Sequence, residues 1–180
     1  TPGEPTSRSD EGAVGQELST AQKRRRQIFE GACEVISRKG YGDSTVREIA
    51  KASGVSVPSL YQYVSSKEDI LFMITEECMR ELFAAFKRNM DTSMSPAEKM
   101  SQAIADYITY ISRNRKYINL VYRETRSLSA RYRDRIFDLE RSLMWEWEQI
   151  FRDGREQGLF QDLNPTLVAN VAYFSCSVWA

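Results

Sequence analysis

Histidine is missing from this sequence of 180 residues, and cysteine is scarce. Without an imidazole the chain lacks the commonest general base and the commonest metal ligand of proteins. Cys33, Cys78 and Cys176 lie far apart and fit no metal-ligand spacing, so we expect buried, reduced thiols. The sequence also shows no paired-carboxylate site, metal cluster or phosphate-binding loop. We therefore expect neither an enzyme nor a bound cofactor or metal.

Long hydrophobic runs are missing as well. No stretch approaches the roughly 20 apolar residues that a membrane-spanning helix requires. Residues 1–12 carry no hydrophobic segment of the kind found in signal peptides. The chain is 42% hydrophobic and 28% charged, which is ordinary for a globular protein that buries a core. We expect a cytoplasmic protein without membrane contact, and at least one further helix after the apolar helical pattern of residues 170–180.

The formal net charge is zero, but the charge is unevenly distributed. Residues 23–67 contain nine Lys or Arg and four Asp or Glu, which leaves this segment at +5. A positive excess at one end is expected of a chain that binds nucleic acid there. The basic run at residues 23–26 suits contact with a phosphate backbone, and a solvated basic turn at a helix start fits it equally well.

Helical periodicity dominates the rest of the chain. Apolar residues recur every three or four positions, and no segment alternates with a period of two for long enough to predict a strand. We therefore expect an all-α fold, with Ile108 and Leu139 among the inward-facing residues. The longer helices are predicted at residues 19–39, 66–90, 95–113, 116–127, 130–156 and 164–180.

Residues 44–71 predict two short helices joined by a tight turn and followed by the start of a longer helix. Thr45 and Glu48 have the spacing of a capping box at the first helix. Gly54 is expected to end that helix, because glycine adopts left-handed backbone angles without steric cost. A helix, a glycine turn and a second helix form the pattern of a DNA-binding helix-turn-helix.

The second short helix is predicted at residues 56–63. Ser56 is its expected cap, and Pro58 falls in its first turn, where a missing N–H is harmless. Ser65 is the expected cap of the following helix, with Glu68 again at the capping-box spacing. We divide the chain accordingly into a flexible tail (1–18), a helix-turn-helix domain (19–65) and a helical body (66–180).

Packing decides which side chains of the second helix can reach DNA. Leu60, with Val55 and Val64, must face inward to hold the helix. The side chains left facing out are Val57, Pro58, Ser59, Gln62 and Tyr63, of which Val57 and Pro58 suit a thymine methyl and Ser59 and Gln62 suit base edges. Tyr61, Tyr63 and Lys67 suit contact with phosphate. The free N–H groups at the helix starts capped by Thr45 and Ser65 also suit phosphate. Tyr61 and Tyr63 as core aromatics, and Lys67 as a surface charge, remain alternatives.

The same residues resemble the DNA-binding signature of the tetracycline-repressor (TetR) family of bacterial transcription regulators. The matching positions are Ser44-Thr45, Ile49-Ala50, Ser53-Gly54-Val55-Ser56, Leu60-Tyr61-Gln62-Tyr63, Ser66-Lys67-Glu68 and Leu71. Val64 departs from the usual Phe, and Pro58 from a small residue. The resemblance implies that Arg47 reaches a guanine, and that a homodimer represses transcription from a palindromic operator until an effector releases it. A protein-interaction module and an enzyme using the helical cavity remain remote alternatives.

The resemblance also implies that the body forms the dimer and senses a small hydrophobic effector. Aromatic, methionine and other apolar residues of the body could line such a pocket or fill a solid core: Phe83, Phe86, Tyr107, Val121, Met144, Trp147, Phe151 and Trp179. Residues 121–127 are similar to regulators that sense acyl-coenzyme A (acyl-CoA) thioesters, and another apolar drug or metabolite is the competing effector. The small residues Ala169, Ala172, Ser175 and Cys176 are expected to pack against a partner helix.

Overall fold

The computed structural model describes residues 19–88 and 93–177, and the described residues are helical without a strand. The expected all-α fold is confirmed. The elements are α1 (Thr20–Lys39), α2 (Val46–Ala52), α3 (Val57–Leu60), α4 (Lys67–Arg88), α5 (Pro96–Arg113), α6 (Arg115–Glu124), α7 (Ala130–Glu156) and α8 (Pro165–Ser177), with a 3-10 turn at Thr125–Ser127 between α6 and α7. None of the helices in the described ranges is long and apolar enough to cross a membrane.

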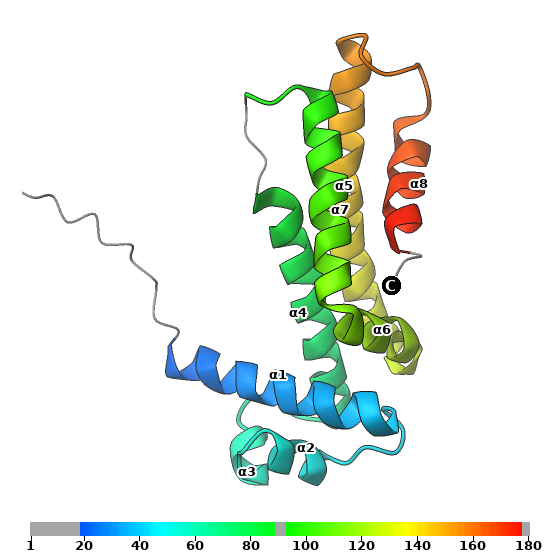
Figure 1. The fold of residues 1–180 in the computed structure, drawn as a ribbon. Helices are drawn as coiled ribbons and strands as arrows, with labels where there is room; N and C mark the ends of the chain where they lie inside the picture. The colour runs from blue at the N-terminus through cyan, green and yellow to red at the C-terminus, as the bar shows by residue number, and fades with distance from the viewer. Residues whose placement is uncertain (1–18, 89–92, 178–180) are drawn as a thin grey trace, which may run out of the picture.

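Helices α1 to α3 form a small head at one end of an elongated body (Figure 1). Helix α4 leaves the head and runs beside α5 and α7, and α8 packs along α7. Helix α1 crosses the base of the body and contacts both α4 and α6. The head therefore meets the body through α1 and through the start of α4.

Local capping signals set most helix starts. Reciprocal capping boxes are present at Ser19, Thr45 and Ser95, as their spacing to the following Gln or Glu predicts. These boxes are read directly from sequence because both partners lie within one turn.

The expected box of Ser65 with Glu68 is wrong by one residue. Ser66 Oγ accepts a hydrogen bond from the Asp69 backbone N–H at 3.1 Å, and Asp69 Oδ2 accepts from the Ser65 N–H at 2.8 Å. Glu68 instead accepts a hydrogen bond from the backbone N–H of Ser129, ahead of α7. Either of the two adjacent serines could have capped α4. The box formed by Ser66 and Asp69 leaves Glu68 free to bind the distant Ser129.

A hydrophobic core runs from the head into the body. In the head, Ile28, Ile36, Ile49 and Leu60 are fully buried. Gly31 lets the end of α2 approach α1, since a Cβ there would lie 2.3 Å from Ser53 Oγ. The close approach holds the helix-turn-helix against α1.

The three cysteines are buried and free, as predicted. Burial raises the pKa of the Cys33 and Cys78 thiols, the latter to about 12. A thiol with so high a pKa stays protonated and unreactive at neutral pH.

Two predictions about which residues face inward are wrong. Ile108 is 42% exposed and Leu139 is 36% exposed. On α5 the buried face passes through Ala103, Tyr107 and Ile111, which turns Ile108 outward. Leu139 borders an open pocket between α4 and α7.

On α8 the small residues do not form a free face. Ala169 and Cys176 are buried within their own chain, together with Tyr173. The exposed apolar residues are Leu167, Val171 and Phe174, at positions i, i+4 and i+7 of the helix. Packing against α5 and α7 buries Ala169 and Cys176 of the small set, while Ser175 stays exposed beside Leu167, Val171 and Phe174.

Candidate DNA-binding surface and effector pocket

Helix α3 is shorter than the sequence predicts. It covers only Val57–Leu60, with the Ser56 side chain accepting a hydrogen bond from the Ser59 N–H at 3.2 Å. Tyr61, Gln62 and Tyr63 follow in a turn, in which the Tyr63 N–H donates to the Leu60 carbonyl at 3.0 Å. The turn continues the helical direction without completing a second α-helical turn.

The turn between α2 and α3 has the expected glycine geometry. Gly54 has a φ of 65°, and the Val55 N–H donates to the Ala50 carbonyl at 3.0 Å. These features close α2 and aim α3 at an angle to it.

Packing beneath α3 agrees with the predicted inward set. Leu60 and Val64 are buried, and Val55 is partly buried against the core. Val57 differs from its predicted outward orientation, because it is also partly buried against the core.

The outer side of this segment carries the predicted polar and aromatic side chains. Tyr61 is 49% exposed and Tyr63 is 39% exposed, so neither is a core aromatic. Pro58 and Gln62 are exposed and Ser59 is half-buried. The structure thus brings these five side chains onto one accessible segment.

Two basic residues flank this segment, and they differ in whether their charged groups have a partner within the protein. Arg47, on α2, is exposed and forms no ion pair with any described residue. Lys67 instead donates a hydrogen bond to the Gly42 carbonyl at 2.9 Å, and its ammonium lies 4.5 Å from the centroid of the Tyr41 ring. Lys67 therefore already supports the turn that precedes α2.

The basic run at residues 23–26 is neither a simple solvated turn nor a free phosphate-binding strip. Arg25 pairs with Glu76 at 3.2 Å, and Arg26 pairs with Glu30 and with Glu81, both at 2.9 Å. Glu76 and Glu81 lie on α4, so two of the four cations join the head to the body. Sequence reasoning missed these pairs because their partners are 51 and 55 residues away.

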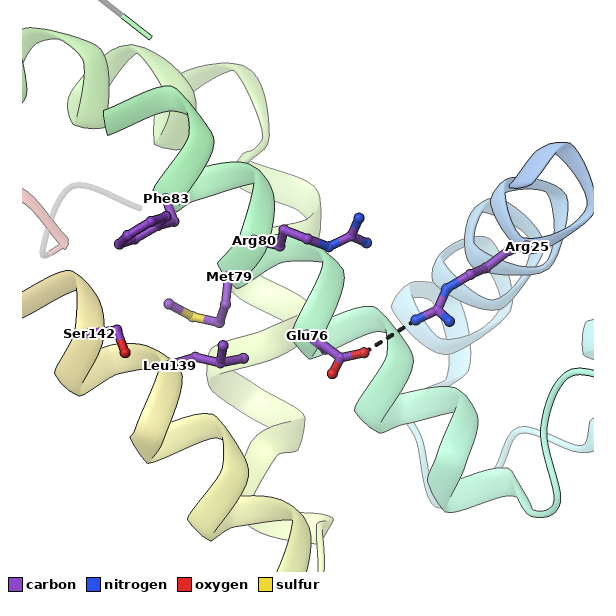
Figure 2. Close-up of a pocket in the computed structure, with 7 residues that line it drawn as sticks. All are labelled: Arg25, Glu76, Met79, Arg80, Phe83, Leu139 and Ser142. Carbon is purple, nitrogen blue, oxygen red and sulfur yellow. Dashed lines mark hydrogen bonds and ion pairs between the residues drawn. The ribbon is translucent and has the colours of Figure 1, made fainter. Parts of the chain in front are cut away.

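An open pocket of about 480 Å³ lies between α1, α4 and α7. Its lining combines apolar side chains with two arginines: Met79, Phe83, Leu139, Ser142, Glu76, Arg25 and Arg80. Figure 2 shows the guanidinium groups of Arg25 and Arg80 pointing toward one another, while Met79, Phe83 and Leu139 lie on the side toward α7. A volume of this size is within the range of small-molecule sites.

The predicted ligand-binding residues are not gathered into this pocket. Phe83 lines it, whereas Phe86, Tyr107 and Trp147 pack together as a solid cluster, with ring centroids 5.2 and 5.9 Å apart. Val121 and Phe151 are buried, and Met144 is partly buried against the core. Trp179 lies outside the described residues. The predicted set did not include Arg25, Arg80 and Leu139. The three residues lie on α1, α4 and α7, and sequence periodicity does not indicate that these helices meet at one pocket.

Comparison with known proteins accounts for both parts of the chain. The family model described as "Bacterial regulatory proteins, tetR family" matches residues 28–74. The model described as "Tetracyclin repressor-like, C-terminal domain" matches residues 93–180.

Individual relatives are named as regulators. The HTH-type transcriptional regulator HbdR of Aromatoleum sp. (strain CIB) is 28% identical over 159 residues, which cover 88% of this chain and 69% of HbdR. The fatty acid metabolism regulator protein of Bacillus subtilis (strain 168) is 27% identical over 132 residues, covering 73% and 68%.

A solved structure shows the same fold. The transcriptional regulator FadR from Bacillus subtilis, in complex with stearoyl-CoA, superposes with a TM-score of 0.74 at 23% identity, covering 85% of this chain and 83% of that one. With family models matched to its head and to its body, the chain belongs to the TetR family of bacterial transcriptional regulators.

Proposed function

We propose that this regulator is a cytoplasmic repressor that binds a palindromic operator as a homodimer and is released by a small hydrophobic effector. An acyl-CoA thioester is the effector we favour, ahead of another apolar drug or metabolite. The observation that carries the DNA-binding part is the segment with Pro58 and Gln62 exposed and Ser59 half-buried, held over a buried Leu60. It presents polar and apolar groups to the major groove from a fixed support.

Each exposed group has a role that its chemistry suits. Ser59 and Gln62 hydrogen-bond base edges, and Pro58 meets a thymine methyl. Tyr61 and Tyr63 donate to phosphate oxygens on either side of the groove. Arg47 carries an unpaired guanidinium, and a bidentate contact with guanine would discriminate by roughly 1–3 kcal/mol.

A homodimer would match the symmetry of a palindromic operator. The exposed face of α8 supports this part of the proposal. Leu167, Val171 and Phe174 form an apolar stripe along one side of that helix. Burial of such a stripe against a second copy removes apolar area from water and so favours association.

The effector part rests on relatives and on the pocket. One relative is named as a regulator of fatty acid metabolism, and a structure with this fold holds stearoyl-CoA. The pocket between α4 and α7 combines apolar walls with arginines, which suits a ligand that has an apolar part and negative charge. An effector changes operator affinity only if it binds the two conformations of the regulator with different affinity.

Selection of duplexes from a random DNA library by the purified protein tests this function. We expect enrichment of an inverted repeat whose half-sites are about one helical turn apart. Lauroyl-CoA is then added to the complex with the selected duplex, and fluorescence anisotropy should report its release. Absence of any enriched sequence would contradict the DNA-binding proposal, whereas enrichment without release would contradict only the acyl-CoA assignment.

A further inference from the structure

One carboxylate joins three helices at the junction of head and body. Glu76 on α4 accepts from Arg25 of α1 through Oε2 and from Arg135 of α7 through Oε1, each at 3.2 Å. Arg135 also lies 4.4 Å from the centroid of the Phe72 ring, so its position has a second support. Arg25 forms no other ion pair with a described residue, and Glu76 is thus its charged link to the body.

The same ion pair forms a wall between two pockets. Arg25 and Glu76 line the apolar pocket of about 480 Å³ and also a smaller one of about 230 Å³. Tyr63, Val64 and Ser65 of the DNA-binding segment border the smaller pocket. Any movement of Arg25 away from Glu76 therefore changes the surroundings of residues that follow α3.

The larger pocket has two chemically different ends. Met79, Phe83 and Leu139 offer apolar surface, while the guanidinium groups of Arg25, paired with Glu76, and of Arg80, paired with Glu77, face one another (Figure 2). Guanidinium groups bind phosphate and carboxylate through paired, charge-assisted hydrogen bonds. The lining is therefore complementary to an amphipathic anion, with its tail against Phe83 and its charged group between the arginines.

Resting on the function proposed above, we infer that the effector's anionic group binds between Arg25 and Arg80 and takes the place of Glu76 on Arg25. The exchange costs little, because the Arg25 and Glu76 side chains are 46% and 28% exposed and exposed ion pairs are weak. Burial of the apolar tail adds a favourable contribution that Glu76 does not have.

Loss of the Arg25–Glu76 pair changes how α1 is held on α4. The Arg26–Glu81 pair, one residue along α1, and the hydrogen bond from Arg123 of α6 to the Ile36 carbonyl both remain, so α1 stays attached and can tilt only about these contacts. Because α2 packs on α1, a tilt moves the whole DNA-binding segment. Coupling between two sites of a regulator typically amounts to about 5- to 150-fold in affinity.

Calorimetric titration of the DNA-free protein tests the exchange. The probes are lauroyl-CoA, laurate and the uncharged dodecanol, each below its micelle concentration, and the variants are Arg25→Gln, Arg80→Gln and Glu76→Gln. We expect Arg25→Gln and Arg80→Gln to weaken binding of the anionic probe by roughly tenfold. Glu76→Gln should tighten it, because the competing carboxylate is gone. Dodecanol should bind all variants alike.

Arg38→Gln is the matched control. Arg38 is another exposed arginine of α1, paired with Glu34 at 3.7 Å, and it lies outside both pockets. This variant should bind every probe as the unmodified protein does.

The possible outcomes test the replacement of Glu76 by the effector's anionic group separately from the proposed repressor function. Tight binding of lauroyl-CoA alone identifies a coenzyme A phosphate as the anion, and binding of laurate as well identifies any carboxylate or phosphate. Equal binding of dodecanol and the anions, or unchanged affinity in Glu76→Gln, would overturn the exchange. Because no DNA is present, such a result leaves operator binding, and release by an uncharged effector, unaffected.

Discussion

The Lys67 ammonium donates a hydrogen bond to the carbonyl oxygen of Gly42 at 2.9 Å, so the first residue of α4 holds the turn that precedes α2. The ring of Tyr41 lies beneath the same ammonium. A cation at this position joins two segments of the head, and its remaining donors stay available to a phosphate. Structural support and DNA contact are therefore compatible in one side chain.

Lys67→Gln should weaken binding to every duplex sequence. Loss of one phosphate contact should lower the slope of log K against log salt by about 0.9. Anisotropy titrations at several salt concentrations measure that slope. Helix α5 begins at the end of the body away from the head (Figure 1). Lys99→Gln, in the first turn of α5, is the control and should leave the slope unchanged. An unaltered slope in Lys67→Gln would remove Lys67 from the phosphate contacts.

Gln62→Ala should change sequence preference rather than general affinity. Gln62 is exposed beside α3, and an amide that reads one base contributes discrimination of roughly 1–3 kcal/mol. Competition between single-base variants of the selected operator should show relaxed preference at one position of each half-site. The exposed Gln157, after α7, offers the control substitution Gln157→Ala. Uniform weakening at all positions would contradict a base contact.

Gly31→Ala should destabilise the head. The added methyl would lie 2.5 Å from the backbone nitrogen of Ser53, and backbone cannot yield as a flexible side chain can. Overpacking of this kind costs typically about 1–3 kcal/mol. Urea denaturation measures the loss. Gly42→Ala is the control, since its methyl would meet nothing within 4 Å. Equal stability of the two variants would argue against the close approach of α1 and α2.

Glu48→Gln should make the free energy of unfolding fall less steeply as the pH is lowered into the acid range. Hydrogen bonds from Lys39 and then Thr45 lower the pKa of Glu48 from 4.5 to about 2. A depressed folded-state pKa gives a contribution that is complete above pH 4.5 and is lost as the pH falls toward 2. Urea midpoints at pH 6 and about pH 3 should therefore differ less for the variant than for the unmodified protein. Parallel losses in both proteins would show that the carboxylate is not coupled to folding.

Val171→Arg should weaken the proposed homodimer. Val171 is 58% exposed at the centre of the apolar stripe on α8, where a guanidinium would meet its own copy or apolar surface across the interface. Sedimentation velocity should show a shift toward monomer at low micromolar concentration. Ile108→Arg, on the exposed side of α5, should not change the association. A dimer that survives Val171→Arg would place the interface elsewhere.

The head was largely predictable from sequence, because its signals are local. Capping boxes at Ser19 and Thr45 join residues three apart, and the glycine that ends α2 acts through its own backbone angle. Burial of Leu60 follows from helical periodicity. The all-α class and the helix-turn-helix therefore followed from short-range chemistry that needs no knowledge of the rest of the fold.

Only the tertiary structure decided which of two equally suitable caps is used, and which residues far apart in sequence are partners. Ser65 and Ser66 are alternative caps, and Glu68 is engaged instead by Ser129, 61 residues away. Helical periodicity predicts that Leu139 faces the core, but its side chain borders the open pocket between α4 and α7. In the sequence, Arg25 is one of four neighbouring cations with no indicated partner. In the structure it pairs with Glu76, which lies on another helix. Sequence spacing carries no information about such contacts, because they depend on how whole helices pack.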